Sequence, residues 1–402
     1  MHHKKVLGGL DAEINEGSGD VRRGNLQPDD GFQQQRTAPS ELQTPKQQQT
    51  GQCPFEDEAS TPVHSNLEIF QRVAGLGIGI ATLLTENVLS HPFIVFRRQC
   101  QVNYHAYRYH VQPFSVVQVI INLQRNQGVA TMWKGLGSAF VVQGIGLGSE
   151  TIISEVTPLA KEINVYSTIK QLFGHLALKA MSATIVLPFF SASLVEEVQS
   201  DIASERPGVF DCIKEGFCRL VGWGIPQTTN LLPVHTLLLP TVLHSLLKYI
   251  ISSIIQFVIL QVMHRAHELR QKDQTGAPPA PRSVMEAYFP ELLAKFAGNF
   301  ITDVILYPLE TVNLRLHLQG TRTIIDNTDT GYGVIPISTR YEGMFECCAA
   351  IIADEGKAGL YKGFGALLLQ YALHATILKM IQVIYTKLAE DFSIGLKQPS
   401  PE

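Results

Sequence analysis

The sequence predicts an all-α membrane protein, a bundle of about six tilted transmembrane helices in three degenerate helix-loop-helix repeats. Only 17% of the 402 residues are charged and 45% are hydrophobic, whereas a typical soluble domain has roughly 25% charged residues. The apolar residues gather in six runs, and a sequence pattern that begins with a proline recurs three times along the chain. Together these observations favour a repeat protein that lies in a membrane.

The six apolar runs are close in length to the roughly 20 residues that cross a ~30 Å hydrocarbon layer. They cover residues 73–90, 136–153, 172–195, 231–263, 292–309 and 364–384. The fourth run is longer than one span and contains Pro233 and Pro240, so five crossings plus an interfacial helix is an open alternative. A soluble protein with buried helices is a weaker alternative, because six such runs leave little amphipathic surface.

Several classes of function are disfavoured by composition. The net charge of −4 gives no sign of a basic surface that would bind polyanions, so nucleic acid is not expected as a partner. The six cysteines show no CxxC spacing and no secreted framework, which indicates reduced thiols. His105 and His110 have no carboxylate or cysteine to complete a metal set, and we expect them in a solvated loop or at the membrane interface. No nucleophile has an adjacent base, so an enzyme, a cofactor and a metal are not expected.

Residues 1–66 differ from the rest of the chain. They are rich in Gln, Gly, Pro and Asp and include Gln33-Gln34-Gln35 and Gln47-Gln48-Gln49. Such a segment buries too little apolar area to offset its ordering entropy, so we expect it to be disordered. It lacks the apolar core of a secretory signal and the acid-poor composition of a mitochondrial presequence, so we expect targeting information in the membrane segments.

The recurring pattern starts where an apolar run ends, at Pro92, Pro188 and Pro308. An acidic or amide residue followed by glycine comes next, in the dipeptides Gln127-Gly128, Glu215-Gly216 and Glu355-Gly356. Proline removes a backbone donor and bends a helix, and glycine allows a turn through a left-handed conformation. The pattern therefore predicts a bent helix, a connecting segment and a turn in each repeat.

An aromatic-Lys-Gly triplet completes the pattern in the first and third repeats. Trp133-Lys134-Gly135 and Tyr361-Lys362-Gly363 both begin five residues after the preceding glycine, and the second repeat lacks the triplet. An aromatic ring beside a lysine suits a membrane interface, where the lysine ammonium reaches water. Equal spacing in two repeats favours common architecture over two unrelated interface anchors.

The pattern resembles the repeat of the mitochondrial carrier family: Pro-x-acid-x-x-base-x-base, then acid-Gly, then aromatic-base-Gly. The resemblance covers about residues 67–388. Residues 86–89, 97–105 and 320–329 are similar to an unusual member of this family that lies in the mitochondrial outer membrane. It implies a multi-pass protein of the mitochondrial outer membrane with protein partners in fusion and fission, cristae organisation and endoplasmic-reticulum contacts, and a lipid as a candidate ligand. The repeat-motif positions are Pro92, Arg97, Gly128, Trp133, Lys134, Gly135, Pro188, Gly216, Pro308, Glu310, Arg315, Gly356, Tyr361, Lys362 and Gly363.

In that family, an acid and a base near each proline form three ion pairs between repeats, and these pairs close one gate of the carrier. Most of these charged residues are missing here. The acid positions are Ile94, Phe190 and Glu310, and the base positions are Arg97, Ser193 and Asn313. The family's cyclic order implies that Glu310 could pair with Arg97, which we interpret as a structural contact. The family's substrate-contact positions correspond to Val142 and Gln370, both uncharged. Exchange of metabolite anions, which would need arginine or lysine there, is therefore disfavoured.

Charged residues remain inside the apolar runs, at Glu86, Glu150, Glu155, Lys179, Lys248, Asp303 and Lys379. Burial in lipid is costly, so each is either part of a site or half of an ion pair. Lys179 could pair with Asp303, and Glu86 with Lys379, across neighbouring helices. The alternative is that these side chains face an axial cavity and belong to a site.

The predicted organisation is a polar head (1–66), a first repeat (67–158), a degenerate second repeat (159–263), a linker (264–289), a third repeat (290–389) and a tail (390–402). The third repeat carries a polar insertion at 321–340, predicted as an exposed surface for partner docking. The leading hypothesis is a membrane organiser that acts through protein partners, with effects on mitochondrial shape and lipid homeostasis. The alternative is a transporter of an uncharged or lipid-like solute, and a membrane enzyme is a weaker third.

Overall fold

A computed structural model describes residues 77, 79–161, 168–202, 208–221, 230–273 and 284–397. The predicted polar head at 1–66 lies outside these residues. All the described residues belong to one compact unit, Ala59–Glu402, and the account below concerns this unit alone.

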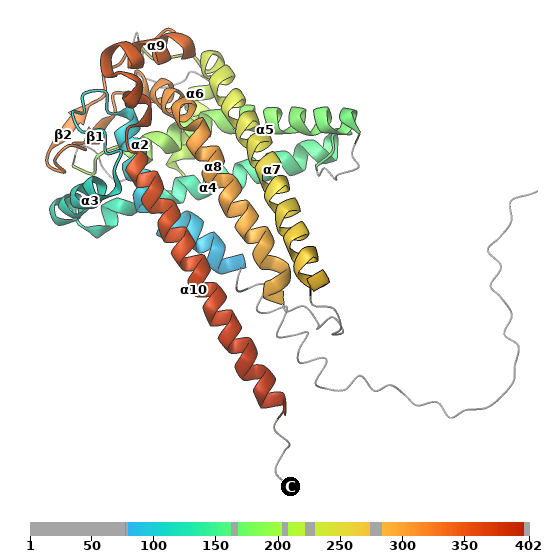
Figure 1. Ribbon diagram of the computed structural model, residues 1–402. Helices are drawn as coiled ribbons and strands as arrows, with labels where there is room; N and C mark the ends of the chain where they lie inside the picture. Colours follow the sequence, from blue (N-terminus) through green and yellow to red (C-terminus); the bar gives the residue numbers. More distant parts are fainter. Residues whose placement is uncertain are drawn as a thin grey trace, which may run out of the picture. The chain divides into compact units, whose positions relative to one another are not determined.

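A long helical segment, a shorter helix and a second long helix follow one another three times in the described chain (Figure 1). In the first set the first long segment is Gly79–Val102, which a π-helical turn interrupts. The three sets are α2 (His91–Val102), α3 (Pro113–Gln127) and α4 (Leu136–Val156); α5 (Ile169–Val198), α6 (Asp211–Val221) and α7 (Val234–Asp273); and α8 (Val284–Leu318), α9 (Met344–Glu355) and α10 (Phe364–Lys397). A π-helical turn, η1 (Thr85–Leu89), precedes α2. Two 3₁₀ turns, η2 (Val129–Trp133) and η3 (Lys357–Tyr361), lead into α4 and α10.

Six described helical segments are long and apolar enough to cross a membrane, judged by length and composition. They are Gly79–Val102, Val129–Val156, Ile169–Val198, Val234–Leu269, Phe289–Leu318 and Lys357–Lys387. Large apolar side chains on them remain exposed, and on α7 Ile254, Phe257 and Val258 are each about half exposed. An outward apolar surface of this kind suits contact with lipid. The number of segments agrees with the predicted bundle of about six membrane helices.

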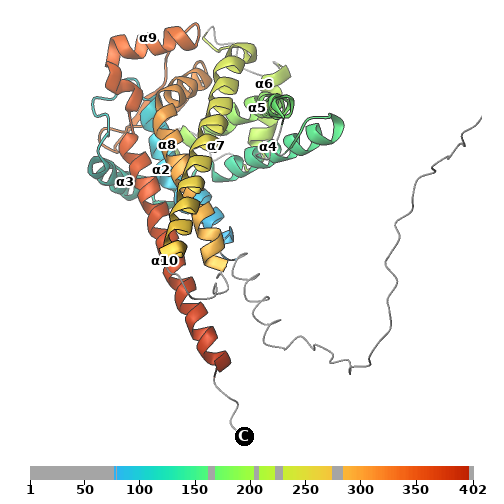
Figure 2. The ribbon, with the colours of Figure 1, turned by 45° about the vertical axis from the view of Figure 1, so that its right-hand side comes forward.

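Neighbouring long helices pack in pairs. In both views α7 and α8 lie side by side, as do α4 and α5 (Figures 1 and 2). The N-terminal helix α2 packs against α10, the last helix of the chain, and also against α8. The first and third sets of helices are therefore in direct contact, and their contacting residues Arg97 and Glu310 are 213 positions apart in the chain.

Local sequence signals explain where several helices begin and end. Thr168 and Gln171 form a capping box at the start of α5, which satisfies two backbone donors that the helix leaves free. Gly128 and Gly356 end α3 and α9 with φ angles of 88° and 74°, a conformation that favours glycine. Gly216 is different, because it lies within α6 and a Cβ there would be 2.5 Å from Cδ1 of Phe189. It allows close helix packing, so the predicted turn glycine of the second repeat is wrong.

Two predicted segment boundaries differ from the structure. The predicted linker 264–289 is largely helical, because α7 continues to Asp273 and α8 begins at Val284. The predicted tail from residue 390 is also helical as far as Lys397. From Val234 onward the fourth apolar run forms one helix, α7; Pro233 precedes it and Pro240 lies inside it.

The insertion 321–340 is folded against the bundle on one side, so its prediction as an exposed surface holds only in part: much of its second half, including Tyr332 and Val334, is exposed. It forms a two-stranded antiparallel hairpin, β1 (Ile324–Asp326) and β2 (Val334–Pro336), with Ile325 opposite Ile335. Thr323, Ile325 and Asp326 are almost fully buried. Ile325 and Ile337 give the insertion an apolar inner side that packs on the bundle, which its mostly polar composition does not indicate.

Candidate functional site

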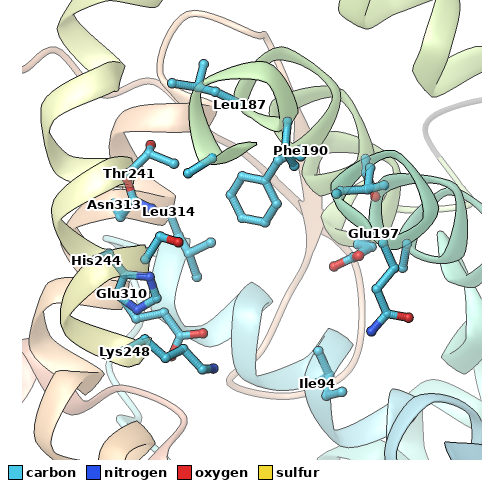
Figure 3. A pocket seen from close by; sticks show the side chains of 18 of the residues that line it. Ile94, Leu187, Phe190, Glu197, Thr241, His244, Lys248, Glu310, Asn313 and Leu314 are labelled. Atoms are coloured by element: carbon cyan, nitrogen blue, oxygen red, sulfur yellow. The ribbon is translucent and has the colours of Figure 1, made fainter. Parts of the chain in front are cut away.

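A cavity of about 540 Å³ lies among α2, α4, α5, α7 and α8. Figure 3 shows His244, Lys248 and Glu310 on one side of it and Glu197 on the other. Val142 lines this cavity, but Gln370 does not. Gln370 lies in a separate cavity of about 130 Å³ with Glu86, Tyr371 and His374. The two predicted substrate-contact positions are therefore not brought together.

The predicted inter-repeat pair is present at the wall of the cavity. Nη2 of Arg97 lies 3.0 Å from Oε1 of Glu310, and both side chains are mostly buried. Nε2 of Gln101 donates to the other carboxylate oxygen at 3.3 Å. The remaining gate positions are uncharged, and two of them make short polar contacts: Ser193 with Ser138 at 3.1 Å and Asn313 with Thr241 at 3.3 Å.

A second ion pair in the cavity was missed by the sequence analysis. Arg98 contacts Glu197, whose side chain is only 3% exposed, and its guanidinium lies over the ring of Phe190 at 5.8 Å. Glu197 lies outside the proline-based positions of the family pattern, so that pattern gave no reason to select it. The only signal was an acidic residue close to the end of an apolar run.

The other membrane charges find partners different from those considered. Lys179 pairs with Glu150 at 2.8 Å, and Asp303 pairs with Lys248 at 2.8 Å. The proposed Lys179–Asp303 pairing is therefore wrong. Glu86 lies 4.0 Å from Lys295, and Lys379 donates to Gln382, so the proposed Glu86–Lys379 pairing is wrong as well. Sequence position alone could not rank partners from neighbouring helices.

One end of the cavity is closed by an apolar cluster, which we call the seal. Its members are Val102, Leu194, Val198, Leu314, Leu318, Ile325 and Ile337, all buried. Val102, Val198 and Leu318 are the last residues of α2, α5 and α8, so the three helices converge there. Leu194 and Leu314 lie four residues earlier on α5 and α8, and the insertion supplies Ile325 and Ile337. The cavity-lining Phe190 packs against the seal, and Leu314 belongs to both.

In the third repeat, the motif residues form a buried ionic network. Nη2 of Arg315 donates to Glu355 at 2.9 Å, and a second contact makes the pair bidentate. Nζ of Lys362 also contacts Glu355 and donates to the carbonyl of Asn103 at 2.8 Å. Lys362 is completely buried, so its predicted position at the membrane interface is wrong. Through the carbonyl of Asn103, Lys362 of the third repeat thus contacts the first repeat.

The first repeat has the same network with a different source of negative charge. Gln99, Gln127 and Lys134 occupy the positions that correspond to Arg315, Glu355 and Lys362. All three donate to one carboxylate, that of Asp326 in the insertion, at 2.9, 2.8 and 2.8 Å. The insertion therefore supplies the acid that the first repeat lacks.

The buried Asp326 is held in its charged form. Burial alone would raise the pKa of its carboxyl, but the Lys134 ammonium and hydrogen bonds from Lys134, Ser200 and Gln127 lower the pKa below its usual value. The Lys134 side chain is 6% exposed and that of Asp326 is 0% exposed. Lys134 is thus a buried partner, and its predicted interfacial position is also wrong.

The remaining motif residues have structural contacts. Nε1 of Trp133 donates to the carbonyl of Val88 at 2.8 Å, and Tyr361 stacks on Tyr307 with ring centroids 5.7 Å apart. Gly135 and Gly363 have φ angles of 69° and 80°. Pro92 lies in the first turn of α2, whereas Pro188 and Pro308 lie within α5 and α8.

Among the described residues, no group of three His, Cys, Asp or Glu side chains is placed to hold a metal ion. His105 is exposed, but the expectation of a solvated His110 is wrong. His110 is 4% exposed, its Nε2 lies 2.8 Å from the carbonyl of Thr328, and its Nδ1 lies 3.1 Å from Ser115. Burial lowers the pKa of this imidazole.

Three long–short–long helix units around a cavity, with an aromatic-Lys-Gly turn in two of them, define a membrane protein of carrier architecture. The family model for the mitochondrial carrier protein matches residues 286–389. The mitochondrial outer membrane protein SLC25A46 of Gallus gallus is 52% identical over 328 residues, covering 81% of this chain and 79% of the relative. The proteins of the same name from Danio rerio and Homo sapiens are 51% and 48% identical over 338 and 351 residues, covering 84% and 85% of this chain and 83% and 84% of the relatives.

The chain therefore belongs to the mitochondrial carrier family and, within it, to the SLC25A46 group. It is a multi-pass protein of the mitochondrial outer membrane with a carrier fold. The resemblance inferred from the sequence to an outer-membrane member of the family is confirmed.

Proposed function

We propose that this protein organises mitochondrial shape through protein partners and does not exchange metabolites across the membrane. The proposed partners belong to the fusion and fission, cristae-organising and endoplasmic-reticulum contact machinery, as the family resemblance implies. An influence on lipid homeostasis is part of the same proposal. The proposed role is not catalytic.

The seal is the observation that carries this proposal. A carrier must open each end of its cavity in turn, and an ion-pair gate opens easily because water solvates the separated charges. Opening the seal would instead expose seven buried apolar side chains. At about 1.5 kcal/mol each, the cost is on the order of 10 kcal/mol, which makes the open state roughly 10⁷-fold rarer than the closed one.

The hairpin adds a second restraint on opening. Backbone N–H of Ser200, just after α5, donates to the carbonyl of Ile324 in β1 at 2.8 Å. Asp326 binds the first repeat through Lys134, and β1 follows α8 in the chain. One short segment thus connects all three repeats at the closed end, which supports a static scaffold.

The test compares the partners recovered by the unchanged protein with those recovered by a variant whose cavity is filled. Proximity labelling and native pull-down of the full chain from outer membranes should recover proteins of mitochondrial dynamics and contact sites. A variant that fills the cavity, Val142→Trp, should recover the same set and restore network shape in cells that lack the protein. Recovery of inner-membrane carriers alone, without dynamics or contact-site proteins, would sink the proposal.

The cavity itself favours one alternative, a transporter of an uncharged or lipid-like solute. Its volume of about 540 Å³ is within the roughly 300–1,000 Å³ of small-molecule sites. Uptake into liposomes reconstituted with the purified chain tests this alternative. Saturable exchange that is abolished by Glu310→Ala would favour transport over scaffolding.

A further inference from the structure

The charges that face the cavity are matched in pairs. Four cationic side chains line it, and each contacts an acid: Arg97 with Glu310, Arg98 with Glu197, Lys179 with Glu150, and Lys248 with Asp303. A free anion would have to compete with a carboxylate that is already in place, and a free cation would meet the opposite problem. The cavity therefore favours an occupant without net charge.

Hydrogen-bond donors nevertheless remain available around the cavity. Nε and Nη1 of Arg97 and Nε of Arg98 have no hydrogen-bond partner among the described residues, but they are almost inaccessible from the cavity. Lys248 is the most exposed of the four cations at 48%, and an ammonium has three N–H donors. The Lys248 ammonium can therefore donate to an occupant that carries oxygen acceptors, as a phosphate does.

The cavity lining that α4 contributes includes exposed apolar side chains. Phe140 and Leu147 of α4 both line the cavity and are 44% and 68% exposed. Ile94, Val142 and Val186 extend the apolar wall inward. A water-soluble solute gains little from such a lining, whereas acyl chains would bury apolar area against it.

We propose that the cavity binds one zwitterionic phospholipid, with its headgroup inside and its acyl chains leaving past Phe140 and Leu147. The phosphate accepts hydrogen bonds from the Lys248 ammonium, and the cationic end of the headgroup faces the carboxylates of Glu150 and Glu310. The headgroup fits a cavity of about 540 Å³, and the chains extend beyond it. Because the opposite end is sealed, the lipid is a bound component. This inference goes beyond the proposed organising role and does not depend on it.

Photo-crosslinking of the purified full chain in phosphatidylcholine nanodiscs tests this proposal. Diazirine-labelled phosphatidylcholine and diazirine-labelled phosphatidylglycerol are compared at equal mole fraction, with the diazirine close to the glycerol backbone. We expect phosphatidylcholine to label cavity-lining peptides of α4 and α5 and phosphatidylglycerol to label them far less. Val142→Trp should reduce this labelling by about tenfold, whereas the control Val141→Trp, next to it but outside the cavity lining, should leave it unchanged.

Thermal unfolding of each variant checks its folding, and Ala183→Phe on the cavity side of α5 replaces Val142→Trp if that variant does not fold. Equal labelling of the same peptides by phosphatidylglycerol would overturn the charge argument. Labelling that persists in the filled cavity, or that falls only on outward-facing peptides, would overturn the site. Loss of labelling in excess glycerophosphocholine, which has no acyl chains, would show a water-soluble ligand and overturn the lipid. No partner protein is present, so failure here is distinct from failure of the organising role.

Discussion

Replacement of Asp326 by asparagine should destabilise the protein by about 3 kcal/mol, because removing one partner of a buried ion pair costs about 3–5 kcal/mol. Asp326→Asn keeps the size of the side chain but leaves the Lys134 ammonium, 6% exposed, without a counter-charge. It also places an amide donor among the donors of Gln99 and Gln127. A loss of this size corresponds to a decrease in Tm of about 6 to 12 °C.

Thermal unfolding monitored with a thiol-reactive dye measures this loss, since Cys100, Cys212 and Cys347 are buried in the folded protein. Asp329→Asn is the matched control. Asp329 accepts two backbone N–H groups, from Tyr107 and Arg108, so its loss should cost about 1 kcal/mol.

Coupling to Lys134 separates the ion pair from a general effect of the substitution. In Asp326→Asn/Lys134→Met the buried unpaired charge is gone, so part of the lost Tm should return. A decrease for Asp326→Asn as small as for Asp329→Asn, or a double variant that loses the sum of both single changes, would refute the reasoning.

The pH dependence follows from the lowered pKa of Asp326 in the folded state. A carboxyl of this kind stabilises the fold above its unfolded pKa of about 3.9, and the stabilisation is lost as pH falls through the folded pKa. The difference in Tm between the wild type and Asp326→Asn should therefore be the same at pH 6 and pH 8. A difference that disappears within this interval would show that the charged carboxylate is not its source.

Three further predictions concern single sites. Gly363→Ala should lower Tm more than Gly333→Ala. Both glycines have a φ of 80°, but only at Gly363 would an added Cβ lie 2.8 Å from the Cβ of Cys100. Equal decreases in Tm would show that this close contact is unimportant. Burial lowers the pKa of His110, so stability should fall as pH decreases below about 6.5, and His110→Asn, which tolerates the φ of 47°, should lose less Tm between pH 7 and pH 5. Burial raises the pKa of the Cys347 thiol to about 12, so alkylation followed by mass spectrometry at pH 8 should label it only after denaturation, and rapid labelling of the native protein would contradict this.

The parts of the fold that the sequence predicts are those that depend on spacing. Two triplets at the same distance from their glycines predict two equivalent turns, and Gly135 and Gly363 do share a left-handed conformation. The apolar runs predict the long helices because each is close to the length of a membrane span. Family order also places Glu310 near Arg97, and the two side chains lie 3.0 Å apart.

The parts that the sequence does not predict depend on contacts between distant segments. Lys134 and Lys362 have the composition of interfacial lysines, yet both are buried because a carboxylate reaches them from elsewhere in the fold. For Lys134 that carboxylate is 192 residues away, in an insertion that interrupts the repeat spacing. One clue was present in the sequence. Gln127 occupies the position of Glu355 in the third repeat, so Lys134 has no acidic partner within its own repeat and needs one from elsewhere in the chain.

This replacement of an acid has a consequence for the closed end of the cavity. In the third repeat Glu355 belongs to the same repeat as Arg315 and Lys362, so that network does not require the insertion. In the first repeat the acid is Asp326, next to Ile325 of the seal. The segment that closes the cavity therefore also supplies the counter-charge for Lys134. A change that lifts the hairpin away would open the cavity only by leaving a buried ammonium unpaired, which adds about 3–5 kcal/mol to the cost of exposing the seal. Closure and the stability of the first repeat are coupled through one hairpin, and this coupling is the physical reason to expect a scaffold where the family has a carrier.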